Sequence, residues 1–251
     1  VNMNRGGPGL GDIGSSQGDY FQAVKGGGHG DYFTYTLAPS SCQEAYDMMF
    51  EAFDVAFAFR NPVLILGDAI VAQMKEPVRP RDPNSPPATP TGEALDWCLT
   101  GAQGREHRII RSLFLDEGAL AGQNRKLMAK YKAMHANVRA EVYEAEDADL
   151  VIVAYGSIGR IVKSAVRKLR GEGKPVGLVR PITLYPFPEQ ILANLAASGK
   201  RFLTIEHNCG QMVQDVRLAV RKHADSEFFG YMPGDMPGTD DFIQPILDVL
   251  G

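Results

Sequence analysis

Apolar residues follow two different periodicities in the first 70 positions of this 251-residue chain. The segment YFTYTL at 32–37 is rich in β-forming residues and predicts a strand. Apolar side chains then recur at helical intervals up to Phe59, after Ser41 and Glu44 in capping-box spacing, and predict a helix. The continuous apolar run VLIL at 63–66 is typical of a strand covered on both faces. Together these elements predict a βαβ unit.

The middle of the chain has a different pattern. Six prolines lie between Glu76 and Thr91, which predicts a stiff, extended connector rather than regular structure. The segment RIIRSLFLD at 108–116 is interpreted as a further strand. From Leu120 to Val138, apolar or neutral residues recur at spacings that alternate between four and three positions. This pattern predicts an amphipathic helix packed against the rest of the chain.

The last hundred residues repeat the order strand–helix three times. Strands are predicted at 150–155, 176–179 and 201–206, and helices at about 158–170, 188–197 and 211–223. Right-handed crossovers would arrange these elements as a small parallel sheet with helices on both faces.

Composition narrows the function classes. Thirty acidic residues against 26 basic ones give a net charge of −4, which argues against broad nucleic-acid binding. The sequence shows no apolar run of the roughly 20 residues that cross a membrane and no secretory signal. The three cysteines form no C-x-x-C pair, so they predict neither an iron–sulfur cluster nor a zinc site in this chain, and they fit a reducing cytoplasm.

Gly9, Gly11 and Gly14 spell G-x-G-x-x-G, the spacing of a dinucleotide-binding loop. That fingerprint needs a strand before the loop and an acidic residue at the end of the next strand. Only the three residues VNM, a short stretch for a strand, precede this loop. The next predicted strand ends in Leu37, Ala38 and Pro39, so it offers no acidic residue to bind a ribose. A nicotinamide site is therefore disfavoured, and the alternatives are a surface loop or a backbone that closely approaches some other ligand.

A set of longer segments resembles the α subunit of the 2-oxoacid:ferredoxin oxidoreductases, most closely the branched-chain (2-oxoisovalerate, or 3-methyl-2-oxobutanoate) branch. The resemblance covers nearly the whole chain, in both the first and the last block. Its segments are RGGPGLGDIGSSQGDYFQAVKGGGHGDY at 5–32, LAPSS at 37–41, EAFDVAF at 51–57, RNPVLILGD at 60–68, MKEPV at 74–78, VAYGS at 153–157 and GLVRPITLYPFP at 177–188.

The resemblance implies an α/β fold in two domains. Residues 1–73 would be the C-terminal part of a thiamine-diphosphate-binding, pyrimidine-type parallel-sheet domain, and residues 141–251 a transketolase C-terminal-like α/β domain. Residues 74–140 would be the proline-rich connector and linking helix. The chain opens on Val1, and α subunits of this family extend further at the N-terminus, so we expect a segment carrying the glutamate that activates the cofactor to be missing.

The implied reaction is the oxidative decarboxylation of a 2-oxoacid to an acyl-CoA, with electrons passed to ferredoxin. Thiamine diphosphate would be shared with a β subunit, magnesium and iron–sulfur clusters would belong to partner subunits, and coenzyme A would be a co-substrate. The expected partners are β, γ and δ subunits, ferredoxin and a small 2-oxoacid, without nucleic acid or membrane. The fragment alone is expected to be inactive.

The resemblance also nominates site residues. Arg5 is expected to bind the substrate carboxylate, because a guanidinium is planar, permanently charged and bidentate; the alternative is a surface arginine near a chain end. The other pocket candidates lie in the same two glycine-rich loops: Gly6, Gly7, Gln17, His29 and Asp31. No metal ligand is nominated.

Glu206, His207 and Asn208 close a predicted strand at its carboxyl end, where ligands of α/β proteins often bind, but an interface or structural role is favoured for them. Three alternatives for the whole chain stay open. It could belong to another thiamine-dependent enzyme, such as a pyruvate or 2-oxoglutarate oxidoreductase or a transketolase-like protein. It could be a nicotinamide-dependent oxidoreductase, or a non-catalytic subunit that closes a partner's site.

Overall fold

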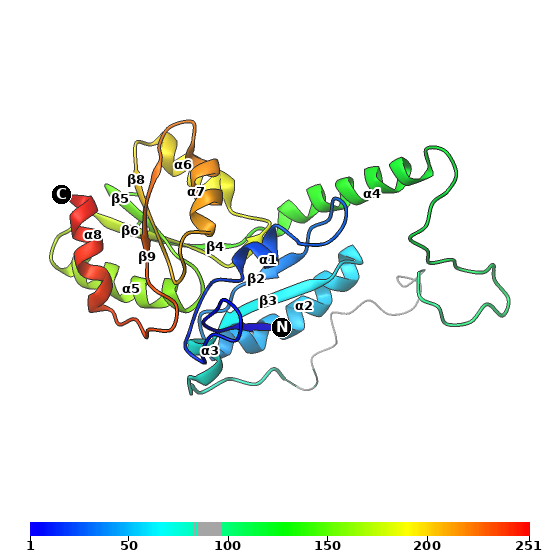
Figure 1. Ribbon diagram of the computed structural model, residues 1–251, viewed down its shortest axis with the longest axis horizontal. Helices are drawn as coiled ribbons and strands as arrows, with labels where there is room; N and C mark the ends of the chain where they lie inside the picture. Colours follow the sequence, from blue (N-terminus) through cyan, green and yellow to red (C-terminus); the bar gives the residue numbers. More distant parts are fainter. Residues whose placement is uncertain (83, 85–96) are drawn as a thin grey trace.

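The computed structural model describes residues 1–82, 84 and 97–251, which form two mostly parallel sheets with helices around them (Figure 1). The first lobe contains β1 (Asn2–Asn4), α1 (Tyr20–Val24), β2 (Tyr35–Leu37), α2 (Cys42–Phe59), β3 (Val63–Asp68) and α3 (Ala69–Gln73). α4 (Ala119–Met134) and the 3₁₀ helix η2 (His135–Asn137) lead to the second lobe. That lobe contains β4 (Ala140–Tyr143), β5 (Leu150–Val153), α5 (Gly156–Gly171), β6 (Val176–Pro181), β7 (Thr183–Tyr185), α6 (Glu189–Ala197), β8 (Arg201–Glu206), α7 (Met212–Val220), β9 (Ser226–Gly230), the 3₁₀ helix η3 (Asp240–Phe242) and α8 (Ile243–Leu250).

The first sheet has the strand order β1-β3-β2-β7. β3 pairs in parallel with β1 and β2, so the predicted βαβ unit β2–α2–β3 is confirmed. β7 comes from the second block of the sequence and pairs antiparallel with β2, placing Thr36 opposite Tyr185. One strand from residues 141–251 therefore completes the sheet of the first lobe.

The second sheet has the order β4-β6-β5-β8-β9, with β4 antiparallel at one edge and the other strands parallel. Side chains of α5 and α8 pack in one buried cluster, and those of α6 and α7 in another. The predicted parallel sheet with helices on both faces is confirmed. The sequence analysis did not predict three elements of this lobe, the strands β4 and β9 and the helix α8.

The start of α2 follows the predicted capping box. The Ser41 hydroxyl accepts a hydrogen bond from the backbone N–H of Glu44 at 3.1 Å, which satisfies one free donor of the first turn. The helix ends at Phe59, and the capping residue Arg60 adopts a left-handed conformation with φ 46° two residues before Pro62.

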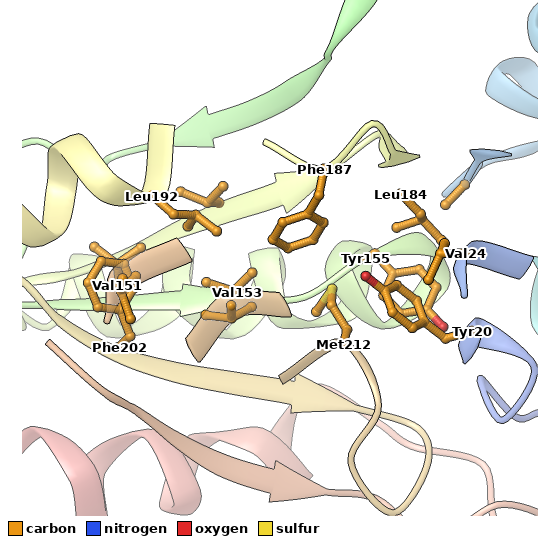
Figure 2. Close-up of a cluster of buried hydrophobic side chains, with 14 of the residues drawn as sticks. Tyr20, Val24, Val151, Val153, Tyr155, Leu184, Phe187, Leu192, Phe202 and Met212 are labelled. Atoms are coloured by element: carbon orange, nitrogen blue, oxygen red, sulfur yellow. The ribbon is translucent and has the colours of Figure 1, made fainter. Parts of the chain in front are cut away.

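A shared hydrophobic cluster joins the two lobes (Figure 2). Tyr20 and Val24 on α1 lie beside Tyr155, Leu184 and Met212 of the second lobe, and all five are buried. Because each lobe contributes aromatic and aliphatic side chains to this cluster, the position of the first-lobe loops is set by the second lobe.

The predicted strand at 108–116 is wrong, because this segment forms no regular structure and pairs with no described strand. Its apolar run is not buried: Ile109 is 77% exposed and Leu115 is 85% exposed. The predicted helix after it is confirmed as α4, of which Tyr131 and Met134 are buried against the first lobe. Of the six connector prolines, Pro77 and Pro80 lie in irregular backbone, and the other four are outside the described residues.

Candidate functional site

Arg5 lies directly after β1, at the carboxyl edge of the first sheet. Its backbone forms an isolated antiparallel bridge with Ser15, which closes the loop between them. Its side chain is exposed, and Nη1 donates to the backbone carbonyls of Leu10 and Asp12, the latter at 2.8 Å. Nε and Nη2 have no hydrogen-bond partner among the described residues. One planar edge of the guanidinium is thus held by the protein, and the other remains available to a carboxylate.

The glycines of this loop allow it to close on itself. The Gly6 N–H donates to the Gly14 carbonyl at 2.9 Å, and the Asp12 N–H donates to the Gly6 carbonyl at 3.1 Å. Gly11 has φ 54°, and a Cβ on it would lie 1.7 Å from the Gly6 oxygen. A Cβ on Gly6 would lie 2.3 Å from the Asp12 carboxylate, whereas one on Gly7 would meet nothing within 4 Å. Loop closure therefore accounts for Gly6 and Gly11, and Gly7 faces open space.

The same loop packs against the second lobe. A Cβ on Gly14 would lie 2.6 Å from the Gly234 carbonyl oxygen, and the Gly234 N–H donates to the Ser15 carbonyl at 3.1 Å. After this contact the chain runs on to α1, which begins only at Tyr20. In a dinucleotide-binding loop the glycines lead straight from a strand into a helix. This geometry disfavours the nicotinamide alternative.

Gln17 is buried at the seam between the lobes. Its Nε2 donates to the Tyr155 carbonyl at 3.0 Å, and its Oε1 accepts from the His207 N–H at 3.1 Å. Its backbone N–H donates to the His207 carbonyl at 2.8 Å, and its carbonyl accepts from Asn208 Nδ2 at 2.9 Å. Because both ends of the amide are engaged across the seam, the structure gives Gln17 a part in joining the lobes.

Asp68 and Ser157 form a second buried contact across the seam, which sequence analysis missed. Asp68 ends β3, and its Oδ2 accepts from the Ser157 hydroxyl at 2.5 Å, while its Oδ1 accepts from the Val71 N–H at 3.1 Å. Burial raises the pKa of Asp68 above its ordinary value, and these hydrogen bonds oppose the rise. A polar residue after an apolar strand is the signal that could have identified it, because such residues meet at the carboxyl edge of a parallel sheet.

Glu206 is a buried carboxylate at the N-terminus of α7. It accepts hydrogen bonds from the backbone N–H groups of Met212 at 2.8 Å and Val213 at 2.9 Å, and from Asn208 Nδ2 at 2.9 Å. Burial raises its pKa, and these donors oppose the rise. Since free N–H groups at a helix start need acceptors, Glu206 serves as an internal cap, in line with the structural role expected for it.

His207 is fully buried beside Tyr231. Its Nε2 lies 3.0 Å from the Met232 carbonyl, so Nε2 carries the proton and donates. Nδ1 has no partner among the described residues, and neither have the buried Asn4 Nδ2 and Ser15 Oγ. Burial lowers the pKa of His207, which favours the neutral form of the ring.

His29 and Asp31 lie far from Arg5 in this chain. They precede β2, whose first residue Tyr35 is opposite Val63 at the start of β3, whereas Arg5 follows the pair Asn4–Asp68 at its end. The two glycine-rich loops therefore lie at opposite edges of the sheet. The Tyr32 hydroxyl oxygen accepts from the N–H groups of Gly27 and Gly28 at 3.1 and 3.0 Å, which orders the second loop.

Two further observations concern what the described residues can hold. They contain no group of three or more His, Cys, Asp or Glu side chains placed to bind a metal ion. None of the helices in the described part of the chain is long and apolar enough to cross a membrane.

Comparison with known proteins places both lobes in one family. Residues 1–95 match the family model described as pyruvate flavodoxin/ferredoxin oxidoreductase, thiamine diP-bdg. Residues 148–242 match the model for pyruvate:ferredoxin oxidoreductase core domain II. The chain is 43% identical over 253 residues to the ketoisovalerate oxidoreductase subunit VorB of Methanothermobacter thermautotrophicus, covering all of this chain and 70% of VorB. It is 32% identical to the 2-oxoglutarate synthase subunit KorA of Methanocaldococcus jannaschii, covering 98% of this chain and 72% of KorA.

A solved structure has the same fold. The 2-oxoglutarate:ferredoxin oxidoreductase of Magnetococcus marinus, described with 2-oxoglutarate, coenzyme A and succinyl-CoA bound, superposes with a TM-score of 0.75 at 20% identity. The match covers 99% of this chain and 48% of that one. The α/β fold predicted from the resemblance is thus confirmed, and on the identity and coverage of its curated relatives the chain belongs to the 2-oxoacid:ferredoxin oxidoreductase family as a subunit of these enzymes.

Proposed function

We propose that this chain is the substrate-carboxylate-binding subunit of an enzyme that oxidatively decarboxylates a branched-chain 2-oxoacid to its acyl-CoA and passes the electrons to ferredoxin. The substrate class follows the name of its 43% identical relative, a ketoisovalerate oxidoreductase subunit. In this assignment residues 1–73 belong to the cofactor-binding domain, residues 74–140 connect, and residues 141–251 form the transketolase C-terminal-like domain.

The observation that carries the proposal is the free edge of Arg5. Two backbone carbonyls of its own loop fix Nη1, which leaves Nε and Nη2 exposed at the carboxyl edge of the sheet. That edge can bind a carboxylate through two parallel hydrogen bonds, as a 2-oxoacid requires for capture and orientation. Gly6 and Gly7 support this role, since Gly6 lets the loop close beneath Arg5 and Gly7 leaves space beside it.

The described residues do not fit the diphosphate group of thiamine diphosphate or its metal ion. They provide no cluster of metal-binding side chains, and the buried carboxylates of Asp68 and Glu206 are already engaged by Ser157 and by the start of α7. A diphosphate is held by a divalent cation with oxygen ligands or by free backbone N–H groups. We therefore assign the diphosphate, its magnesium ion and the iron–sulfur clusters to partner subunits.

The proposed enzyme is an assembly of several subunits. The β subunit would complete the site, with γ and δ subunits and ferredoxin receiving the electrons, coenzyme A as co-substrate and the cytoplasm as the location. The names of the curated relatives, each a subunit of an oxidoreductase or synthase, support an assembly of this kind. Gln17, as part of the lobe seam, would support the Arg5 loop, while His29 and Asp31 would contribute only through a surface remote from Arg5.

Reconstitution tests this function. The full-length chain is combined with its partner subunits, and viologen reduction dependent on coenzyme A is measured with 3-methyl-2-oxobutanoate, pyruvate and 2-oxoglutarate. We expect the highest kcat/KM with 3-methyl-2-oxobutanoate. If 2-oxoglutarate were the only one of the three substrates to be oxidised, the chain would instead belong to a 2-oxoglutarate oxidoreductase. Reduction of NAD in place of viologen would contradict the proposal.

A further inference from the structure

The loop that carries Arg5 also exposes two large apolar side chains. Leu10 is 86% exposed and Ile13 is 82% exposed, although both lie in a segment that is closed by backbone hydrogen bonds. A single exposed apolar side chain is ordinary on a protein surface, whereas neighbouring ones beside a binding group can contact a ligand. Leu10 and Ile13 lie on either side of Asp12 in the sequence, and we call these two side chains the apolar rim of the Arg5 loop.

The backbone of the rim contacts the guanidinium, because Nη1 donates to the carbonyls of Leu10 and of Asp12, which precedes Ile13. Arg5 Nη1 donates to the carbonyl of Leu10 itself, so the residue that fixes the guanidinium also carries one of the exposed side chains. The other contacts of the loop are internal or directed to the second lobe: Gly14 N–H donates to Asp12 Oδ1 at 3.0 Å, and Gly234 N–H donates to the Ser15 carbonyl. A carboxylate bound to Nε and Nη2 would therefore lie on the same guanidinium group that the backbone of Leu10 and Asp12 holds, within one residue of both exposed apolar side chains.

The chemistry of a branched-chain 2-oxoacid matches this arrangement. Its branched carbon is only two bonds from the carboxylate carbon, so a single loop can contact both ends of the molecule. We infer that Leu10 and Ile13 contact the branched alkyl group of the substrate and select it over shorter 2-oxoacids, a conclusion that rests on the proposed function. An added methylene in an apolar pocket changes kcat/KM by roughly 10- to 200-fold, which gives two such contacts enough discrimination.

Asp12 adds selection against a second carboxylate. It lies between Leu10 and Ile13 in the sequence, and its side chain is fixed by the Gly14 N–H. Because the Asp12 carbonyl accepts from Arg5 Nη1, a dicarboxylic 2-oxoacid bound at Arg5 would add a second negative charge to a loop that already carries this carboxylate, and like charges in close proximity disfavour binding. The loop thus combines an anchor for one carboxylate, contacts for an alkyl group and a penalty for a second charge.

The test uses the assembled enzyme with Leu10→Ala, Ile13→Ala and the conservative Ile13→Val. Leu115→Ala is the matched control, because Leu115 is equally exposed at 85% but lies in the segment before α4. For each variant, kcat/KM is measured with 3-methyl-2-oxobutanoate and with pyruvate, which lacks the two methyl groups. Affinity for the partner subunits and the thermal unfolding of the chain are measured in parallel.

We expect each alanine variant to lower kcat/KM for the branched substrate by about 5- to 50-fold while changing that for pyruvate less than about twofold. The kcat/KM of Ile13→Val for the branched substrate should lie between those of the parent and of Ile13→Ala. The control Leu115→Ala should have the kcat/KM of the parent. In addition, Asp12→Asn, which keeps an oxygen to accept the Gly14 hydrogen bond, should raise the relative use of 2-oxoglutarate by about fivefold or more.

An unchanged ratio between branched substrate and pyruvate, within twofold, would overturn the inference. So would a parallel loss of activity with both substrates together with weaker subunit binding, because the rim would then be covered by a partner chain. If the unmodified assembly oxidises no 2-oxoacid, the proposed function itself is wrong. If the assembly is active but its substrate selectivity does not change in the Leu10 and Ile13 variants, only the present inference is wrong.

Discussion

Gln17 and His207 form a reciprocal pair across the two lobes, in which each residue donates its backbone N–H to the other. The Gln17 N–H meets the His207 carbonyl at 2.8 Å, and the His207 N–H meets Gln17 Oε1 at 3.1 Å. The pair continues directly from the Arg5 loop, so it fixes the carboxyl edge of the first sheet against the end of β8. The position of the proposed substrate site therefore depends on a seam between lobes.

Gln17→Ala should destabilise the protein by about 2–4 kcal/mol, because it removes two buried hydrogen bonds and leaves the His207 N–H without a partner, while the Tyr155 carbonyl keeps only its bond from the Gly159 N–H. Urea denaturation provides the measurement. The control Gln190→Ala changes an exposed glutamine on α6 and should stay within about 0.5 kcal/mol of the parent. Unchanged stability combined with a raised KM would instead place Gln17 in the substrate pocket.

His207 should make folding stability depend on pH. The unfolded chain protonates histidine near pH 6.5, whereas burial lowers the pKa of His207 in the folded protein. Below that pH the unfolded state binds more protons, so stability is lost as pH falls through about 6.5 toward the folded pKa. Melting temperatures between pH 7.5 and 5.5 should fall less steeply for His207→Gln than for the parent.

The exposed Gln190 offers the comparison for this prediction. Gln190→Ala removes no titratable group and should keep the pH dependence of the parent. Parallel melting curves for the parent and His207→Gln across the same range would show that His207 does not titrate with folding.

Gly11→Ala should impair the proposed substrate site more than Gly9→Ala. Both residues have positive φ, 54° and 69°, so both alanines carry the cost of a left-handed backbone. Only the Cβ at position 11 would overlap the Gly6 oxygen, which would force the loop open under Arg5. In the assembled enzyme, kcat/KM should be about tenfold lower for Gly11→Ala than for Gly9→Ala. Equal effects would mean that loop closure does not position Arg5.

Much of this architecture was predictable because its signals are local. The β2–α2–β3 unit and the alternating elements of the second lobe come from contiguous apolar runs and helical spacing, which the structure confirms. β7 was not predictable, since its pairing with β2 joins Thr36 to Tyr185, far along the chain. The segment 108–116 has a strand-like composition but no partner strand, and pairing rather than propensity decides whether a strand forms.

The resemblance of its loop to one family nominated Arg5, and its role in binding substrate stays a prediction. The contacts that organise its surroundings link distant residues, as in Gln17 with His207 and Asp68 with Ser157. Residues placed together by folding leave no spacing pattern in the sequence. Their shared signal is weaker: each polar side chain follows or faces the carboxyl end of a parallel strand.

The chain alone should bind thiamine diphosphate weakly or not at all, because the described residues contain no metal-binding cluster for its diphosphate. Titration calorimetry with thiamine diphosphate and magnesium should detect no binding at micromolar concentrations. The assembled enzyme should bind the cofactor under the same conditions. Tight, magnesium-dependent binding by the chain alone would contradict the assignment of the diphosphate to a partner subunit.

The central claim is that Arg5 binds the substrate carboxylate, and its substitution in the assembled enzyme tests that claim most directly. Arg5→Ala removes the guanidinium, while Arg5→Lys keeps the charge without the bidentate edge; Arg221→Ala, an exposed arginine of the second lobe, is the control. A lost charge-assisted hydrogen bond costs about 1.5–3 kcal/mol, or roughly 10- to 150-fold. We predict a loss of that size in kcat/KM for 2-oxoacid-dependent viologen reduction with Arg5→Ala, a smaller loss with Arg5→Lys and none with the control. A kcat/KM for Arg5→Ala within about twofold of the parent would contradict the account and leave Arg5 as a surface residue.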